Sequence, residues 1–265
     1  MTSLKTNVER LEEAKLKISN KEEYIEFLSF CKKFYNKEFE NQLLIYSQNK
    51  YATIVKSFLE WKFAGRKTKK QPKTIYLCKD YKLKQKNFID GQVDINGKEK
   101  KQRKNNKLEV IGNKTIERTC GYDISDTLID RKSNYKFQTL RLEEISIDKE
   151  EFYNLIKSLW SKNENNILNI DDDIIYRIRK LCDYILEEDE CNLINEYYNL
   201  FLDSITYLVV NYFGFNINNK LEFKEYNKLL ELPLNEFLQF GVYTQRISKT
   251  MIDLLKERMN LELSA

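Results

Sequence analysis

The sequence predicts an α+β fold in which helices come first, a small sheet follows, and a mostly helical segment ends the chain. Apolar residues recur at helical spacing in the first sixty residues, alternate around residues 74–122, and return to helical spacing after residue 148. Only seven glycines and two prolines occur in 265 residues, which favours long regular elements with few tight turns. A chain of this length can form two domains. We expect them at 1–145 and 146–265.

The first elements expected are two helices. A polar helix carries Val8, Leu11 and Ile18 at its apolar positions. A more apolar helix follows, with Tyr24, Phe27, Leu28, Cys31, Phe34 and Tyr35 at helical spacing. We expect these two apolar faces to pack in the core.

A further helix and three strands are expected between residues 53 and 122. Thr53 is a suitable N-cap for a helix that carries Trp61, and Gly65 stands where a left-handed residue would end it. Val55, Phe58, Leu59 and Phe63 are its apolar residues. Residues 74–79, 108–111 and 115–122 read as strands. The lysine-rich stretch 79–107 between them is expected to be a mobile loop or ribbon.

Charge is divided unevenly along the chain. Residues 1–145 contain 32 lysines and arginines against 20 acidic residues, whereas residues 146–265 contain 13 against 21. The segment 62–107 alone holds 16 basic and 4 acidic residues. Codon bias in an A/T-rich genome could raise the lysine content, but it would not separate the charges. A polyanion, with nucleic acid as the first candidate, is therefore the expected partner of the first half.

One segment carries a family resemblance. Ten residues follow the order of a known signature: Asn41, Gln42, Leu44, Ile45, Gln48, Ala52, Thr53, Trp61, Gly65 and Arg66. In this order the chain resembles the N-terminal single-stranded-DNA-binding domain of the ArdC/LtrC-like antirestriction proteins of plasmids and phages. The family's Lys-Gly-Glu-Lys-Gly turn is replaced by Lys70–Thr74, without either glycine. Residues 122–127 resemble the family's strand end, with Asp126 in place of a glutamine.

Ten residues in and beside this segment are expected to bind DNA. A single strand exposes phosphates and unstacked bases, so it is bound by cations together with planar side chains. The expected phosphate contacts are Arg66, Lys67, Lys69, Lys70 and Lys73. Trp61, Tyr46 and Tyr51 are the expected stacking residues, and Asn41 and Gln42 could hydrogen-bond sugar, phosphate or base edges. The competing interpretations are core packing for Trp61 and Tyr46, a solvated loop for the lysines, and capping or buried polar roles for Asn41 and Gln42.

The second half is expected to be helical. Asp148 can cap a helix that runs through Phe152 to Leu159. The later helices carry Ile174, Ile178, Leu181, Cys182 and Ile185, then Leu193 to Tyr212 ahead of Gly214, and finally Ile247, Met251, Leu254 and Leu255.

Residues 203–214 resemble a helix of the family's second, zincin-like metallopeptidase domain, with Asp203 at the position of the acidic zinc ligand. The chain contains no histidine, so the His-Glu-x-x-His zinc site of that design cannot form. We therefore expect a degenerate, pseudo-metallopeptidase module, and no enzyme, catalytic residue, metal or cofactor. The carboxylates at 171–173 and 187–190 could bind Mg²⁺ or Ca²⁺ weakly, but a helix start and a solvated loop are the preferred interpretations.

The cysteines and the apolar pattern indicate a compartment. Five cysteines without a C-x-x-C pair favour reduced thiols. No signal-peptide-like or membrane-spanning apolar run occurs, so we expect a cytoplasmic protein without a membrane partner.

Three functions remain open at this point. The first is a non-catalytic single-stranded-DNA-binding protein of a mobile element or phage, with an antirestriction or anti-defence role and weaker binding to double-stranded DNA. The second is a protein-interaction inhibitor that binds a host restriction nuclease or defence protein through the acidic helical half. The third is a divalent-metal nuclease.

Overall fold

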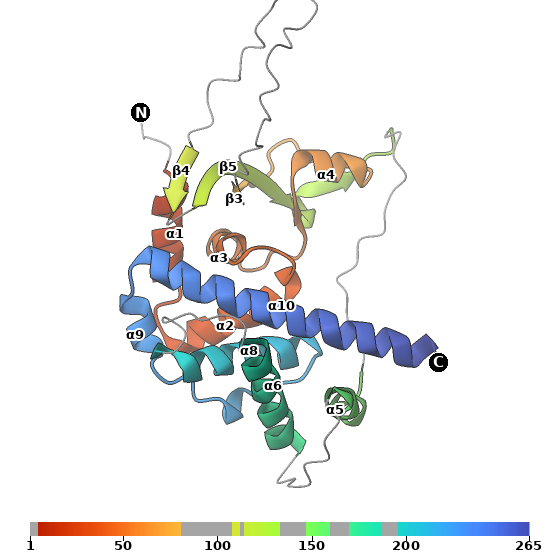
Figure 1. Cartoon of the computed structure of the whole chain (residues 1–265). Helices are drawn as coiled ribbons and strands as arrows, with labels where there is room; N and C mark the ends of the chain where they lie inside the picture. Colours follow the sequence, from red (N-terminus) through yellow and green to blue (C-terminus); the bar gives the residue numbers. More distant parts are fainter. Residues whose placement is uncertain are drawn as a thin grey trace, which may run out of the picture.

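The structure, a computed structural model, describes residues 5–80, 108–111, 114–132, 147–159, 170–186 and 196–264. It confirms the α+β fold predicted from the sequence, with a small antiparallel sheet at one end and helices making up the rest (Figure 1). The lysine-rich stretch predicted to be a loop lies, from residue 81 to 107, outside the described residues.

The two predicted N-terminal helices are present as α1 (Asn7–Leu16) and α2 (Lys21–Cys31). A 3-10 turn, η1 (Lys32–Phe34), and a further helix, α3 (Phe39–Gln48), follow them. Thr6 and Glu9 form a reciprocal capping box at the start of α1, and Asn20 caps α2. The predicted apolar faces of α1 and α2 are buried, from Leu11 through Phe34.

The sheet is built around one long central strand. β5 (Lys114–Asp123) pairs antiparallel with β1 (Val55–Lys56), β3 (Ile75–Asp80) and β4 (Leu108–Ile111). Ile75 lies opposite Gly121, and Asp80 lies opposite Ile116. Ile75 and Leu77 are two residues apart, so they share one face of the sheet, and both are buried. The strands predicted at 74–79, 108–111 and 115–122 are thus confirmed within a residue or two.

The helix predicted after Thr53 begins later than expected. Val55 is in strand β1, and the helix α4 spans Phe58–Phe63 with Ser57 as its N-cap. Thr53 does not cap it, because the helix begins five residues later, and the backbone N–H of Thr53 donates to the carboxylate of Asp123 at 2.8 Å. Gly65 ends the helix with a φ of 71°, as predicted. A two-stranded ribbon of β2 (Arg66–Thr68) and β6 (Thr127–Ile129) follows.

The second half is helical, as predicted. Its helices are α5 (Lys149–Ser158), α6 (Ile170–Leu186), α8 (Tyr198–Tyr212), the 3-10 turn η3 (Asn218–Lys220), α9 (Tyr226–Glu231) and α10 (Leu234–Ser264). The carboxylate of Asp148 accepts from the N–H of Glu151 at 2.8 Å, which confirms the predicted N-cap. No helix in the described ranges is long and apolar enough to cross a membrane.

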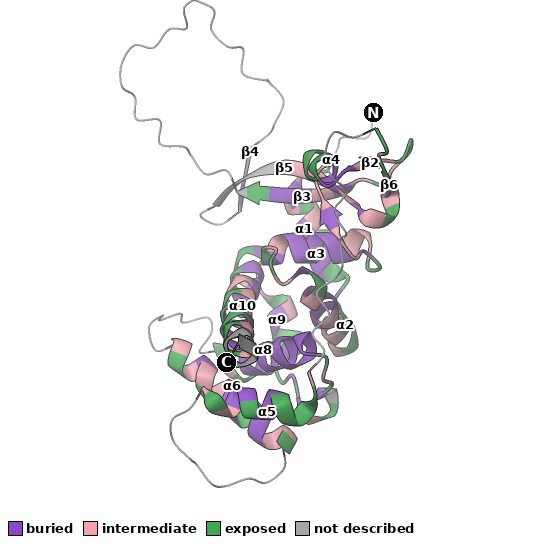
Figure 2. Ribbon diagram, turned by 90° about the vertical axis from the view of Figure 1, so that its right-hand side faces the viewer, coloured by how far each residue is buried: buried purple, intermediate pink, exposed green. Residues whose placement is uncertain are grey.

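The core is continuous between the two predicted domains. α2 packs on α8, where the hydroxyls of Tyr24 and Ser204 are 2.8 Å apart. α10 crosses α3 (Figure 1). At Gly241 of α10 a side chain would collide with the ring of Phe39. Buried residues run without a break through the helical layer under the sheet (Figure 2). The predicted boundary at 145/146 lies among residues 133–146, outside the described part.

Candidate nucleic-acid interface

Two amides of the family-like signature bind the outer edge of the sheet. Asn41 donates to the carbonyl of Cys78 at 2.9 Å and accepts from its N–H at 2.8 Å. Seven residues further along α3, Gln48 makes the same pair of bonds with Tyr76, both at 2.9 Å. The two side chains therefore satisfy the free edge of β3 much as a neighbouring strand would. The structure thus gives Asn41 a buried structural role.

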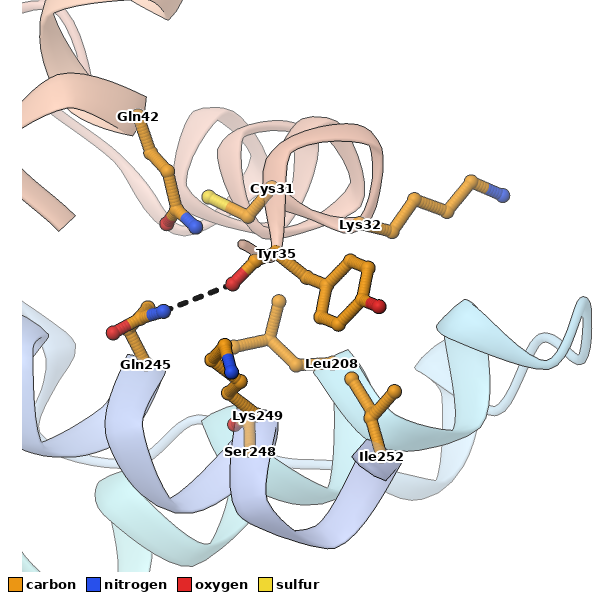
Figure 3. A pocket seen from close by; sticks show the side chains of 9 residues that line it. All are labelled: Cys31, Lys32, Tyr35, Gln42, Leu208, Gln245, Ser248, Lys249 and Ile252. Carbon is orange, nitrogen blue, oxygen red and sulfur yellow. Dashed lines mark hydrogen bonds between the residues drawn. The ribbon is translucent and has the colours of Figure 1, made fainter. Parts of the chain in front are cut away.

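Gln42 also lies inside the molecule. Its amide nitrogen donates to the carbonyls of Phe34 at 2.9 Å and Lys37 at 3.1 Å. It borders a cavity of about 20 Å³ between α2, α8 and α10, where Gln245 donates to the carbonyl of Tyr35 (Figure 3). This volume is about that of one water molecule. Gln42 fixes the turn between α2 and α3 and is buried away from any DNA-sized ligand.

Trp61 is fully buried under α4. Its indole N–H donates to the carbonyl of Tyr122 in β5 at 2.8 Å. The ring cannot stack on a base in this conformation, so core packing, the competing interpretation of the sequence, describes its place in the structure. Trp61 attaches α4 to the sheet.

Arg66 connects the two strands of the ribbon. Its Nε donates to the hydroxyl of Thr127 at 2.7 Å, and its guanidinium lies 5.8 Å from the ring centroid of Trp61.

Asp123 adds a connection that the sequence did not reveal. Its buried carboxylate accepts from the N–H groups of Thr53, Ile54 and Ser125. The family-like strand end around residue 123 therefore joins the end of β5 to the segment before β1. In the sequence it is recognisable only as an acidic residue after a predicted strand.

The predicted phosphate contacts that remain accessible lie on β2 and on the turn from β2 to β3. Lys67, Lys69, Lys70 and Lys73 are all exposed. Lys67 makes a surface ion pair with Asp130 at 3.6 Å, and such pairs contribute little to stability. The backbone N–H of Lys69 donates to the carbonyl of Asp126 at 2.9 Å, which fixes the start of the turn. Four ammonium groups therefore extend from an anchored backbone.

Tyr46, Tyr51 and Lys73 come together at an open hollow of about 460 Å³ beside this turn. Tyr51 is 79% exposed, so its ring is available to a ligand. Tyr46 is buried and donates to the carboxylate of Glu26 at 3.2 Å. Burial raises the pKa of the Tyr46 phenol, and Glu26 raises it further, so the hydroxyl stays protonated. Of the three predicted stacking residues, only Tyr51 presents an accessible ring.

The residues singled out in the second half are engaged in ion pairs. Asp203, which the resemblance placed at the zinc-ligand position, is buried, pairs with Arg179 and accepts from the N–H of Phe223 at 2.8 Å. Asp171, Asp172 and Asp173 pair with Lys149, Lys220 and Arg177 respectively, within 2.5–2.8 Å. Residues 187–190 lie outside the described part. Within the described part, no group of three or more potential metal ligands occurs.

Comparisons with known proteins add no relative. A scan against protein-family models finds no match, and searches of curated proteins and of solved structures likewise find none.

Proposed function

We propose that this chain is a non-catalytic single-stranded-DNA-binding protein of a mobile element or phage, with an antirestriction or anti-defence role. The observation that carries the proposal is the row of exposed ammonium groups at Lys67, Lys69, Lys70 and Lys73 on an anchored strand and turn. Phosphate contacts from lysine supply most of the affinity in sequence-independent binding. The resemblance of residues 41–66 to the ArdC/LtrC-like signature supports the same ligand.

In this proposal the signature residues form a scaffold, and the turn that follows them forms the contact surface. Asn41, Gln48 and Trp61 fix α3, β3 and α4 relative to one another through hydrogen bonds to backbone groups. Such a scaffold would position the lysines of the turn without touching DNA. The hollow bordered by Tyr51 and Lys73 adds an exposed ring beside the cations, the combination that single-strand binding uses.

A preference for single strands follows from the exposed ring. Stacking on Tyr51 requires an unpaired base, whereas the lysines can contact the phosphates of either form. Double-stranded DNA is therefore the weaker ligand in this proposal. Coating the incoming strand would then shield it from host restriction.

A protein partner that binds the acidic helical half is the less favoured alternative. The acidic clusters at 171–173 and 187–190 are the reason to consider a host nuclease or defence protein as partner, and the second cluster lies outside the described residues. Each carboxylate of the first cluster faces a cation of the same chain, so that cluster presents little uncompensated negative charge. We therefore favour DNA over a protein target.

The proposal is tested by fluorescence anisotropy of labelled single- and double-stranded oligonucleotides of matched sequence. We expect tighter binding to the single strand, and a large loss of affinity when Lys69, Lys70 and Lys73 are replaced together by alanine. Lys33, Lys180 and Lys228 are exposed lysines elsewhere, and their triple alanine variant is the matched control for net charge. Binding that is absent, or that both triple variants weaken equally, would contradict the proposal.

A further inference from the structure

Helix α4 presents an apolar face to solvent. Phe58 is 53% exposed, Leu59 61% and Phe63 54%. Successive residues of a helix are about 100° apart, so these three side chains and Lys62 share one continuous face. Trp61 falls outside this arc, about 60° from Phe58 and about 160° from Phe63, and is fully buried. The helix therefore uses its indole for attachment, while the rings of Phe58 and Phe63 are about half exposed.

These rings belong to a well-anchored element. Ser57 and Glu60 form a reciprocal capping box, with the Ser57 N–H donating to Glu60 at 2.7 Å. Trp61 attaches the middle of the helix to β5, and Gly65 ends it. Preorganised rings lose little conformational entropy when a ligand covers them.

The surroundings of this face are cationic. Residues 54–70 and 124–132, which form α4 and the β2–β6 ribbon, contain eight lysines and arginines against three acidic residues. On the ribbon, the exposed Leu128 pairs with Lys67, and the exposed Ile129 pairs with Arg66. Figures 1 and 2 show α4, β2 and β6 together at the end of the molecule away from α5 and α6.

We infer that Phe58 and Phe63 are a base-stacking platform for single-stranded DNA, and that Lys62 and the ribbon cations hold the backbone beside it. This inference rests on the proposed function and deepens it by adding stacking contacts on α4 to the one proposed for Tyr51. Charge complementarity selects the ligand, because apolar rings among cations suit a polyanion whose bases are unpaired. A duplex hides its base faces and gains nothing from the rings.

The test compares two double variants. Phe58→Leu with Phe63→Leu removes the rings and keeps the face apolar, whereas Phe58→Tyr with Phe63→Tyr keeps the rings. We expect the leucine pair to weaken single-strand binding by roughly 5- to 150-fold per stacked base, and the tyrosine pair to bind within about twofold of wild type. The salt dependence of the leucine pair should equal that of wild type, since no phosphate contact is lost.

Tyr176→Leu with Tyr184→Leu removes two exposed rings from α6 and is the matched control, which should bind as wild type does. Thermal melts establish that each variant is folded. If wild type binds single-stranded DNA and the leucine pair binds it equally well, the stacking platform is refuted and the proposed function stands. If wild type does not bind, both are refuted. If wild type is a dimer, and Phe58→Asp makes it a monomer without changing its DNA affinity, then the face binds a second copy of the chain. That result would overturn the inference.

Discussion

Replacing Trp61 with phenylalanine separates a structural role from a DNA-contacting role. The variant removes the indole donor from the partly buried Tyr122 carbonyl, and leaving an acceptor unpaired on burial costs about 1–3 kcal/mol. The smaller ring leaves roughly 40 Å³ unfilled, which adds about 1 kcal/mol at 24 cal/mol per Å³. We therefore expect the free energy of unfolding to fall by about 2–4 kcal/mol.

The assay is urea unfolding followed by circular dichroism, together with anisotropy under conditions where the variant is folded. DNA affinity should stay within about twofold of wild type, because the indole does not face the ligand. Tyr184→Phe is the control: its ring is 68% exposed, so stability should change by less than about 0.5 kcal/mol. An unchanged unfolding midpoint, or a tenfold loss of affinity in the folded variant, would refute this reasoning.

Three further predictions concern stability. Asn41→Ala removes both hydrogen bonds to the backbone of Cys78 on the β3 edge and should cost about 2–4 kcal/mol in urea unfolding; a change below about 0.5 kcal/mol would contradict its structural role. Ser57→Ala removes the α4 capping box and should cost about 1 kcal/mol. Burial opposes ionisation of Glu60, but its bonds to Ser57 outweigh this and lower its pKa below 4.5. The box therefore stabilises fully above pH 4.5 and is lost as pH falls through that lowered pKa, so the difference between wild type and Ser57→Ala should shrink in acid melts; a constant difference would contradict this linkage. Asp203→Ala should cost about 2–3 kcal/mol, less than a fully buried pair because Arg179 is partly exposed, while EDTA leaves the wild-type Tm unchanged; a Tm that EDTA lowers would instead make Asp203 a metal ligand.

Local patterns predicted much of the fold. The N-cap at Asp148, the helix end at Gly65 and the three strands of the sheet depend on neighbouring residues, and the structure confirms them. The prediction of Thr53 as a cap is wrong because residues 55–56 pair with residues 122–123 of β5, more than sixty residues later in sequence, so the helix begins only after Ser57. The three-residue strands of the ribbon were missed because so short a segment carries no detectable period.

The candidate site was harder to predict for the same reason. The burial of Trp61 depends on a carbonyl sixty-one residues away, and the Asn41 and Gln48 amides depend on the edge of a strand that forms later in the chain. The periodicity around Phe58 showed that the helix is amphipathic, but it did not show that the indole alone turns inward. The exposed lysines needed no tertiary information, and the structure places them where a ligand could reach them.

The most direct test of the account is the salt dependence of single-strand binding for wild type and for the Lys69, Lys70 and Lys73 triple alanine variant. Each phosphate neutralised on a single strand contributes about 0.7 to the slope of log K against log salt. We predict that the triple variant lowers the magnitude of this slope by about 2, while the Lys33, Lys180 and Lys228 control keeps the wild-type slope. Equal slopes in all three proteins would contradict the claim that this turn binds the DNA backbone.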